Sequence, residues 1–287
     1  MSIDVAFSVN RALAVPLMVT INSIIKNAQQ PDDLRFNVVI PPGATSDFQP
    51  QLNLAFPDRH QQIRLIEYLP PQYLRDYLDA RFKPDSETRK NSRYMQYSRL
   101  FFKAAMPDVT RLVYFDADII VLGDVGELYA QGKQLTAKQY VGAVPQNFPA
   151  WGYFSNPLKG WGEVKQFKRT FNSGVLLTDL TYWQDETYDR LKYYLNWDAE
   201  NDYKLYNLGD ETVMNLMFKQ DYLPLDSSWN RCGYGNMRIL TWLFDTNPDG
   251  MNVIHWSGGH HKPWRSKGIP FGKLWESYRP ESIRSVA

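Results

Sequence analysis

The segment 112–121 constrains the fold of this chain more than any other part of the sequence. It is rich in β-branched and aromatic residues and is interrupted only by Asp116, Ala117 and Asp118. An apolar run of this length, closed by a glycine, predicts one buried central strand. Because side chains two positions apart on a strand point to the same side, Asp116 and Asp118 should project together where the strand ends.

Two carboxylates this close together are costly in a buried place unless a positive charge joins them. A divalent cation meets that need, and oxygen ligands favour Mg²⁺ or Mn²⁺. The alternative is a chance pair in a turn or at a helix end, where acidic residues are common. The hydrophobic flanks favour the metal, because such pairs at the ends of buried strands are typical of functional sites.

The first 70 residues alternate between strand and helix patterns. This alternation predicts an α/β fold with a mostly parallel sheet and helices on both faces. Ligands bind such sheets beyond the carboxyl ends of the strands, and Ser8 and Asn10 lie at the end of the first strand. The expected strands cover 3–8, 36–40 and 63–67, and the expected helices cover 16–25 and 47–56.

A polar stretch precedes the acidic strand. Residues 78–93 are charged and polar, which indicates a loop or a frayed helix, whereas 94–105 has the apolar spacing of a helix. Arg99 lies on this helix, which leads directly into the acidic strand. We therefore expect Arg99 close to the two aspartates.

The composition changes after residue 121. Residues 146–170 are rich in glycine, proline and aromatic residues, and a connection of this length is usually functional. It is either a mobile lid or an ordered surface excursion. A strand is expected at 171–177, and Thr181 and Asp210 are expected to cap the two helices that follow.

Composition excludes several classes of protein. The chain has 287 residues, 44% hydrophobic and 15% aromatic, which is enough for one large core. The net charge is +1 with no basic block, so nucleic acid is not an expected partner. Cys232 is the only cysteine, which excludes an intramolecular disulfide and a zinc site built from cysteines. Because no apolar run reaches about 18 residues, no transmembrane segment is expected.

Four short segments stand out by their residue types and their order. They are 115–118 (Phe-Asp-Ala-Asp), 171–174 (Phe-Asn-Ser-Gly), 208–211 (Leu-Gly-Asp-Glu) and 255–264, which begins His-Trp-Ser-Gly and ends Lys-Pro-Trp. Together they resemble glycosyltransferase family 8, which includes glycogenin, bacterial lipopolysaccharide glucosyl- and galactosyltransferases, and plant galacturonosyltransferase-like proteins. From the part of the chain that the resemblance covers, we expect a GT-A domain at 1–265 and a C-terminal extension at 266–287, packed on or beside that domain.

This resemblance implies a GT-A fold, which is a Rossmann-like form of the α/β architecture. It also implies transfer of a hexose with retention of anomeric configuration, from a UDP-sugar such as UDP-glucose or UDP-galactose. By the same resemblance Asp116, Asp118 and His255 hold Mn²⁺, with Mg²⁺ as the alternative ion. Two carboxylates and one imidazole leave open positions that a diphosphate can fill.

The resemblance implies further contacts to the donor. Gly258 lets the backbone approach the diphosphate, and Lys262 adds a positive charge there. The remaining contacts are divided between the donor sugar (Arg99, Asn172 and Asp210) and the nucleotide (Ser8, Asn10 and Ala117).

Glu211 completes the expected catalytic group together with Asp210 and Arg99. The lipopolysaccharide enzymes commonly carry glutamine at this place, on the sugar face opposite the leaving group. A carboxylate there can act as the nucleophile of a double displacement. It can also stabilise a positively charged sugar or bind a hydroxyl while the acceptor attacks on the leaving-group face, which is the interpretation we favour.

Two other functions compete with this one. A sugar-phosphate nucleotidyltransferase would need a glycine-rich, basic loop after the first strand, but residues 8–16 hold no glycine and a single arginine. A non-catalytic nucleotide-sugar-binding protein should have lost a metal ligand, whereas all three candidates are present.

The acceptor is expected to be a carbohydrate, a lipid-linked glycan or a protein. The aromatic segments 146–170 and 229–242 are where an acceptor would stack. We expect a cytoplasmic protein, and peripheral contact with a membrane is an option through apolar residues near the C-terminus. The preferred alternative is that the same residues form a packed terminal helix. These residues are Phe271, Leu274, Trp275 and Tyr278.

Overall fold

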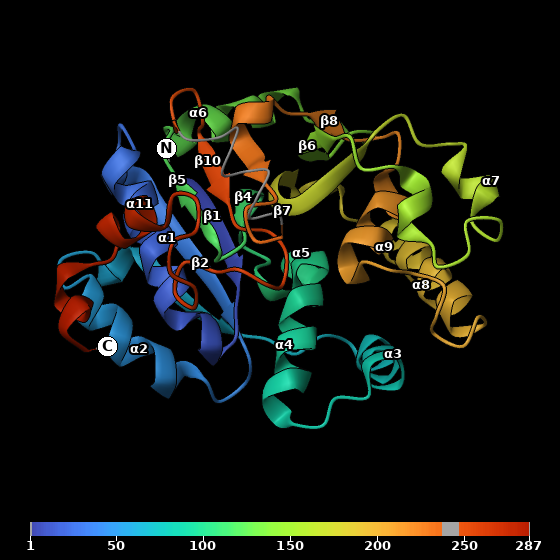
Figure 1. Cartoon of the computed structure of the whole chain (residues 1–287), viewed down its shortest axis with the longest axis horizontal. Helices are drawn as coiled ribbons and strands as arrows, with labels where there is room; N and C mark the ends of the chain where they lie inside the picture. The colour runs from blue at the N-terminus through green and yellow to red at the C-terminus, as the bar shows by residue number, and fades with distance from the viewer. Residues whose placement is uncertain (1, 237–246, 287) are drawn as a thin grey trace.

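A computed structural model describes residues 2–236 and 247–286 of the chain. Seven strands form one sheet in the order β3-β2-β1-β4-β7-β6-β8 (Figure 1). Neighbouring strands are parallel except at β7, which runs antiparallel to both β4 and β6. The sheet is therefore mostly parallel, as the sequence predicts. Its strands are β1 (Ile3–Ser8), β2 (Leu34–Ile40), β3 (Ile63–Glu67), β4 (Arg111–Phe115), β6 (Val141–Gln146), β7 (Thr170–Asp179) and β8 (Leu223–Pro224).

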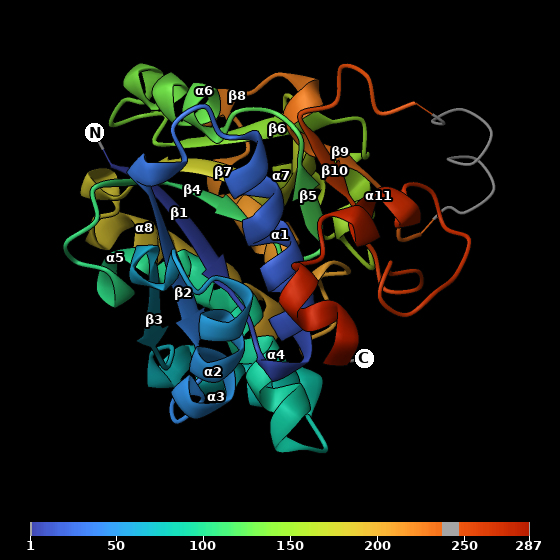
Figure 2. The ribbon, with the colours of Figure 1, turned by 90° about the vertical axis from the view of Figure 1, so that its left-hand side faces the viewer.

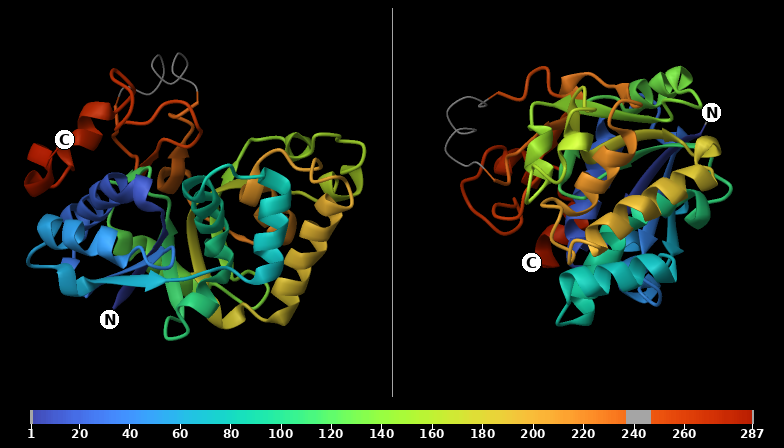
Figure 3. Two further views of the ribbon diagram at one scale, coloured as in Figure 1. Left: turned by 90° about the horizontal axis from the view of Figure 1, so that it is seen from below. Right: turned by 90° about the vertical axis from the view of Figure 1, so that its right-hand side faces the viewer.

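Helices cover both faces of this sheet, because alternate side chains of its strands are apolar on each side. On β4, Val113 and Phe115 pack into the core under the first group of helices, and Leu112 and Tyr114 pack under the second. Figure 3 shows the blue helices on one side of the sheet and the cyan and yellow helices on the other. The first group is α1 (Ala14–Asn27), α2 (Thr45–Ala55) and α6 (Val125–Ala130); the second is α3 (Gln72–Phe82), α4 (Glu87–Ser98), α5 (Phe102–Ala105), α8 (Asp185–Ala199) and α9 (Gly209–Phe218).

The prediction of one strand over 112–121 is wrong. The chain leaves the large sheet after β4, turns through residues 116–118, and enters a second sheet as β5 (Ile119–Val121). This sheet has the order β5-β10-β9, with β10 at Val253–His255 and β9 at Arg231–Cys232. The break arises because β5 pairs with β10 through Ile120 and Ile254, a partner from the far end of the chain. The two aspartates consequently sit in a turn between two sheets.

The polar stretch 78–93 is also different from its prediction, since it contains the end of α3 and the start of α4. Lys83 ends α3 with a left-handed φ of 43°. Ser86 then caps α4, where its side chain accepts a hydrogen bond from the Arg89 amide. The many charged residues cover the exposed face of α4, whose apolar face buries Tyr94 and Met95.

Neither predicted helix cap is correct. Thr181 lies in a 3-10 turn that Asp179 caps, and α8 begins later, at Asp185. Asp210 is the second residue of α9 rather than its cap, because Gly209 already starts the helix. This shift places the carboxylates of Asp210 and Glu211 in the first turn of α9.

Residues 146–170 form an ordered excursion in this structure. A short helix, α7 (Trp161–Val164), lies within it. The excursion is joined to the chain that precedes α9, since the Ser155 amide donates to Leu205 O and the Asn207 amide donates to Tyr153 O, both at 2.9 Å. Lid movement of this segment stays a prediction.

The C-terminal residues form a packed helix, α11 (Gly272–Ser277), beside α1 (Figure 2). Trp275 is 1% exposed and packs against the second sheet, and Asn22 of α1 donates to Tyr278 O at 2.7 Å. The boundary at residue 265 stays a prediction. Among residues 2–236 and 247–286, no helix has the length and apolarity needed to cross a membrane. Part of the acceptor region 229–242, from residue 237 on, lies outside the described residues.

Candidate functional site

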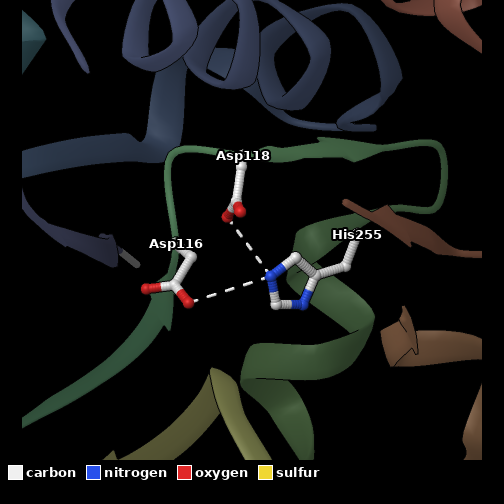
Figure 4. A group of neighbouring side chains, drawn as sticks. All are labelled: Asp116, Asp118 and His255. Carbon is white, nitrogen blue, oxygen red and sulfur yellow. Dashed lines mark ion pairs between the residues drawn. The ribbon is translucent and has the colours of Figure 1, made fainter. Parts of the chain in front are cut away.

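Three predicted metal ligands meet where the two sheets join. Asp116 follows β4, Asp118 precedes β5, and His255 ends β10, which is paired with β5. The ring of His255 points between the two carboxylates (Figure 4), with Nε2 3.2 Å from Asp118 Oδ1 and 3.8 Å from Asp116 Oδ2. The ligand atoms of the three side chains all lie within 4.8 Å of one another.

Each carboxylate is held by one oxygen, which leaves the other directed at His255. Asp116 Oδ1 accepts from Arg99 Nη2 at 2.8 Å and from the Tyr114 hydroxyl. Asp118 Oδ2 accepts from Lys262 Nζ, which also donates to Trp256 O at 2.6 Å. Two anchored carboxylates and one imidazole around a shared centre fit a divalent cation such as Mn²⁺.

The electrostatics of the centre favour the ionised form of Asp118. Burial alone would raise the pKa of Asp118, but His255 and Lys262 together hold that pKa well below its usual range. Burial would lower the pKa of Arg99, but Asp116, Tyr114 and Asp210 together keep that pKa above its usual value. Arg99 is therefore a fixed positive charge beside Asp116.

Gly174 makes the approach of His255 sterically possible. Gly174 O accepts from the Asp116 amide at 2.8 Å, which places the glycine directly beside the centre. A Cβ at this position would lie 2.2 Å from His255 Cε1 and 2.8 Å from Asp116 Oδ2. Only glycine lets strand β7 pass so close to both side chains.

A cleft of about 380 Å³ opens beside the two aspartates. Residues at the end of β1, in the chain that follows β10, and on one face of α4 line this cleft. The predicted residues that line it are Ser8, Asn10, Arg99, Asp116, Ala117, Asp118, Gly258 and Lys262. Of these, Ser8 donates to Met95 O at 2.6 Å and Asn10 Oδ1 accepts from the Ala12 amide at 3.1 Å, so both also stabilise local structure.

Asp210 offers a buried oxygen without a hydrogen bond. Its Oδ1 accepts from Gln96 Nε2 at 2.5 Å. Its Oδ2 lies 3.3 Å from Arg99 Nε and forms an ion pair with it, but it accepts no hydrogen bond there because that N–H points to Gln96 O. Burial raises the pKa of Asp210, and Arg99 opposes the rise. Asp210 is 3% exposed, so Oδ2 is a buried oxygen with unused hydrogen-bonding capacity beside Arg99.

Glu211 lies beside Asn172, to which it is hydrogen-bonded. Its Oε2 accepts from Asn172 Nδ2 at 2.7 Å, and its Oε1 lies 3.5 Å from the Tyr153 hydroxyl. Burial and the neighbouring Asp210 raise the pKa of Glu211 to about 7, although the bond from Asn172 opposes the rise. The carboxyl group is thus harder to ionise than an exposed glutamate.

Sequence reasoning missed three residues of this region. Gln96 could have been found, because it lies three residues before Arg99 on the same side of its helix. Tyr153 belongs to the excursion 146–170, where nothing in the sequence separates it from other aromatic residues. Asn230 accepts from His255 Nδ1 at 3.0 Å, a contact across the fold with no local signal.

Comparison with known proteins decides the family. Residues 4–268 match the sequence profile described as Glycosyl transferase family 8. The chain belongs to glycosyltransferase family 8. Membership in this family of transferases agrees with the resemblance inferred from the sequence, and it separates the chain from the sugar-phosphate nucleotidyltransferases.

Plant relatives and solved glycosyltransferase structures are similar to this family-8 chain. Probable galacturonosyltransferase-like 7 of Arabidopsis thaliana is 23% identical over 267 residues, which cover 90% of this chain and 70% of the relative. The structure of galactosyltransferase LgtC with donor and acceptor sugar analogs matches at a TM-score of 0.70 and 18% identity, over 99% of this chain and all of LgtC. The bifunctional glycosyltransferase WbbM matches at 0.68 and 18% identity, over 98% of this chain and 50% of WbbM.

These structural matches show that the fold is GT-A, as expected. A family-8 glycosyltransferase takes its sugar from a nucleotide-sugar donor and passes it to an acceptor. The described side chains of Asp116, Asp118 and His255 form a group that could hold a metal ion.

Proposed function

We propose that this chain is a metal-dependent, retaining hexosyltransferase that uses a UDP-sugar, with UDP-glucose or UDP-galactose as the first candidates. The metal is Mn²⁺, with Mg²⁺ as the alternative. The acceptor is a hydroxyl of a carbohydrate, a lipid-linked glycan or a protein. One observation carries the proposal: Asp116 and Asp118, which converge with His255, line a cleft that also holds Arg99 and Lys262.

The metal, when bound, neutralises charge on the departing diphosphate and is worth several kcal/mol to the transition state. Hydrogen bonds already anchor both carboxylates before a metal binds, and the lowered pKa of Asp118 favours its ionised form. The carboxylate oxygens that face His255 accept no described hydrogen bond from another residue. Metal binding therefore needs little rearrangement of Asp116 and Asp118.

The remaining residues bind and orient the donor. Lys262 supplies a positive charge at the phosphates, and Gly258, with φ of 105°, leaves the backbone open beside them. Arg99 and the unbonded oxygen of Asp210 face the sugar, where that oxygen accepts a hydrogen bond from a sugar hydroxyl. The nucleotide lies along the cleft wall formed by Ser8, Asn10 and Ala117.

Glu211 is proposed to stabilise the sugar or bind its hydroxyl rather than to attack it. A carboxyl whose pKa is about 7 is only partly ionised at neutral pH, which weakens it as a nucleophile. Its bond from Asn172 occupies one oxygen. A Glu211→Gln variant should therefore keep measurable turnover. A glycosyl adduct trapped on Glu211 would reverse this assignment.

The proposal is tested by donor turnover without acceptor. Purified protein with Mn²⁺ is incubated with a panel of nucleotide sugars, and released nucleoside diphosphate is measured. The names of the plant relatives add UDP-galacturonic acid to UDP-glucose and UDP-galactose in the panel. We expect one UDP-sugar to be consumed by the wild type and none by Asp118→Ala. Preference for a nucleotide sugar other than a UDP-sugar would refute the donor assignment.

A further inference from the structure

Three buried side chains form a continuous chain of hydrogen bonds from His255 to Glu211. His255 Nδ1 lies 3.0 Å from Asn230 Oδ1. Asn230 Nδ2 donates to Asn172 Oδ1 at 3.1 Å, and Asn172 Nδ2 donates to Glu211 Oε2 at 2.7 Å. His255 is 1% exposed, Asn230 4% and Asn172 9%, so solvent does not compete along the chain.

A backbone amide fixes the direction of this chain. The Gly174 amide lies 3.0 Å from Asn172 Oδ1, and a backbone N–H can only donate. The oxygen of Asn172 must therefore face Gly174, and its nitrogen must face Glu211. That oxygen can only accept from Asn230, so Asn230 must present its nitrogen to Asn172 and its oxygen to His255.

The same reasoning identifies which nitrogen of the His255 ring donates to Asn230. Because Asn230 presents an oxygen, His255 must donate from Nδ1. In the neutral ring Nε2 then carries the lone pair, and Nε2 is the nitrogen that faces Asp116 and Asp118. Asn230 thus occupies Nδ1 and leaves Nε2 as the nitrogen that can bind a metal.

The Glu211 end of the chain is fixed as well. Asn215, one turn further along α9, is fully buried and makes three hydrogen bonds. It accepts from the Phe171 amide at 2.9 Å and donates to Phe171 O at 2.8 Å and to Glu211 O at 2.9 Å. Helix α9 is thereby locked to the start of β7, and Glu211 keeps its place beside Asn172.

We propose that Asn230 is a positioning residue with two tasks. It sets His255 so that Nε2 faces the metal position, and through Asn172 it joins that ring to Glu211, so that the metal and the sugar-face carboxyl are aligned as one unit. This inference rests on the proposed metal site. Asn230 itself lines none of the described cleft around Asp116, so its effect must pass through the two side chains that it contacts.

Two variants separate the tasks. Asn230→Leu keeps the branched shape but removes both hydrogen bonds. Asn230→Asp still accepts from His255 Nδ1 but has no N–H for Asn172. The matched control is Asn37→Ala, which removes another buried, hydrogen-bonded asparagine whose partners are Asp4 and Arg64. Mn²⁺ affinity is measured by titration calorimetry, and kcat and KM are measured with the active donor.

Asn230→Leu should bind Mn²⁺ about 10- to 100-fold more weakly than the wild type, the usual effect of losing a residue that orients a metal ligand. Asn230→Asp should restore Mn²⁺ affinity to within about threefold of the wild type, yet lower kcat about 10-fold, because Glu211 is no longer aligned. Asn37→Ala should lose thermal stability while its Mn²⁺ affinity stays unchanged. A purely structural role for Asn230 would not produce this split between affinity and kcat.

The outcomes distinguish this inference from the proposed function. Absence of Mn²⁺ binding by the wild type would overturn the proposed function itself. Wild-type binding with unchanged affinity in Asn230→Leu would overturn the inference alone. If Asn230→Leu does not fold, Asn230→Asp decides, because equal losses of affinity and kcat in that variant would also contradict the two tasks.

Discussion

Replacement of Gly174 by alanine tests the geometry of the site with a single methyl group. The added Cβ would lie 2.2 Å from His255 Cε1, whereas ordinary contact begins at 3.4 Å, so the ring must retreat by about 1.2 Å. The ring is 1% exposed and is bonded to Asn230, so it has no open space to enter. Overpacking of this kind typically costs about 1–3 kcal/mol of unfolding free energy.

The effect on activity should exceed the effect on stability. A displacement of about 1 Å in a catalytic arrangement can lower the rate about 100-fold. We therefore expect Gly174→Ala to release nucleoside diphosphate about 100-fold more slowly and to need more Mn²⁺ for half-maximal rate, while it stays folded. The assay is the initial rate of donor hydrolysis over a series of Mn²⁺ concentrations, beside a urea unfolding curve.

Gly162→Ala is the matched control, because a Cβ at Gly162 in α7 meets no atom within 4 Å. It should behave as the wild type in both measurements. If Gly174→Ala hydrolyses the donor and responds to Mn²⁺ like the control, then His255 does not need its observed position, and the argument from close approach is wrong.

Three further changes have defined outcomes. Arg99→Ala leaves Asp116 and Asp210 without their shared cation and should lower the urea-derived unfolding free energy by about 3–5 kcal/mol; a loss under 1 kcal/mol would contradict the role of that buried pair. Burial raises the pKa of Glu211 from 4.5 to about 7, so its ionisation costs stability progressively as pH rises through that window. The unfolding free energy of Glu211→Gln should thus exceed that of the wild type by about 1–2 kcal/mol at pH 8, a figure discounted because the side chain is partly exposed. This gain in unfolding free energy should vanish near pH 4. Mn²⁺ at about 100 times its Kd should raise the unfolding free energy by about 2.7 kcal/mol in the wild type and by nothing in His255→Ala.

The sequence was a good guide where local pattern decides structure. The strand at 3–8 and the strand at 63–67 have the predicted bounds, since apolar runs between polar turns leave few alternatives. The mostly parallel sheet follows from the alternation of strands and helices. The first half of α4, residues 87–93, was missed because its exposed face is nearly all polar, and only the cap at Ser86 marks its start.

Long-range pairing was beyond the reach of the sequence. The break between β4 and β5 depends on β10, whose residues come more than 130 positions later. The antiparallel direction of β7 likewise depends on pairing rather than on composition. Both features matter for the site, because the break turns the two aspartates toward His255, and β7 brings Gly174 beside them.

The chemistry of the candidate site was easier to foresee than its supports. Asp116, Asp118 and His255 could be named as one group from their residue types and from the family resemblance. Their partners could not be named in the same way, because Tyr114 is a strand residue among other apolar residues and Asn230 has no motif. Only tertiary contacts show that these side chains fix the proposed ligands.

Binding of UDP with and without Mn²⁺ tests the central claim most directly. Titration calorimetry on the wild type measures the Kd of UDP first with saturating Mn²⁺ and then with EDTA, and Asp118→Ala provides the control. We expect Mn²⁺ to tighten UDP binding at least about 10-fold in the wild type, in the range of typical coupling free energies, and to have no effect in Asp118→Ala. Equal UDP affinity with Mn²⁺ and with EDTA in the wild type would contradict a metal bridge between Asp116, Asp118 and His255 and the donor.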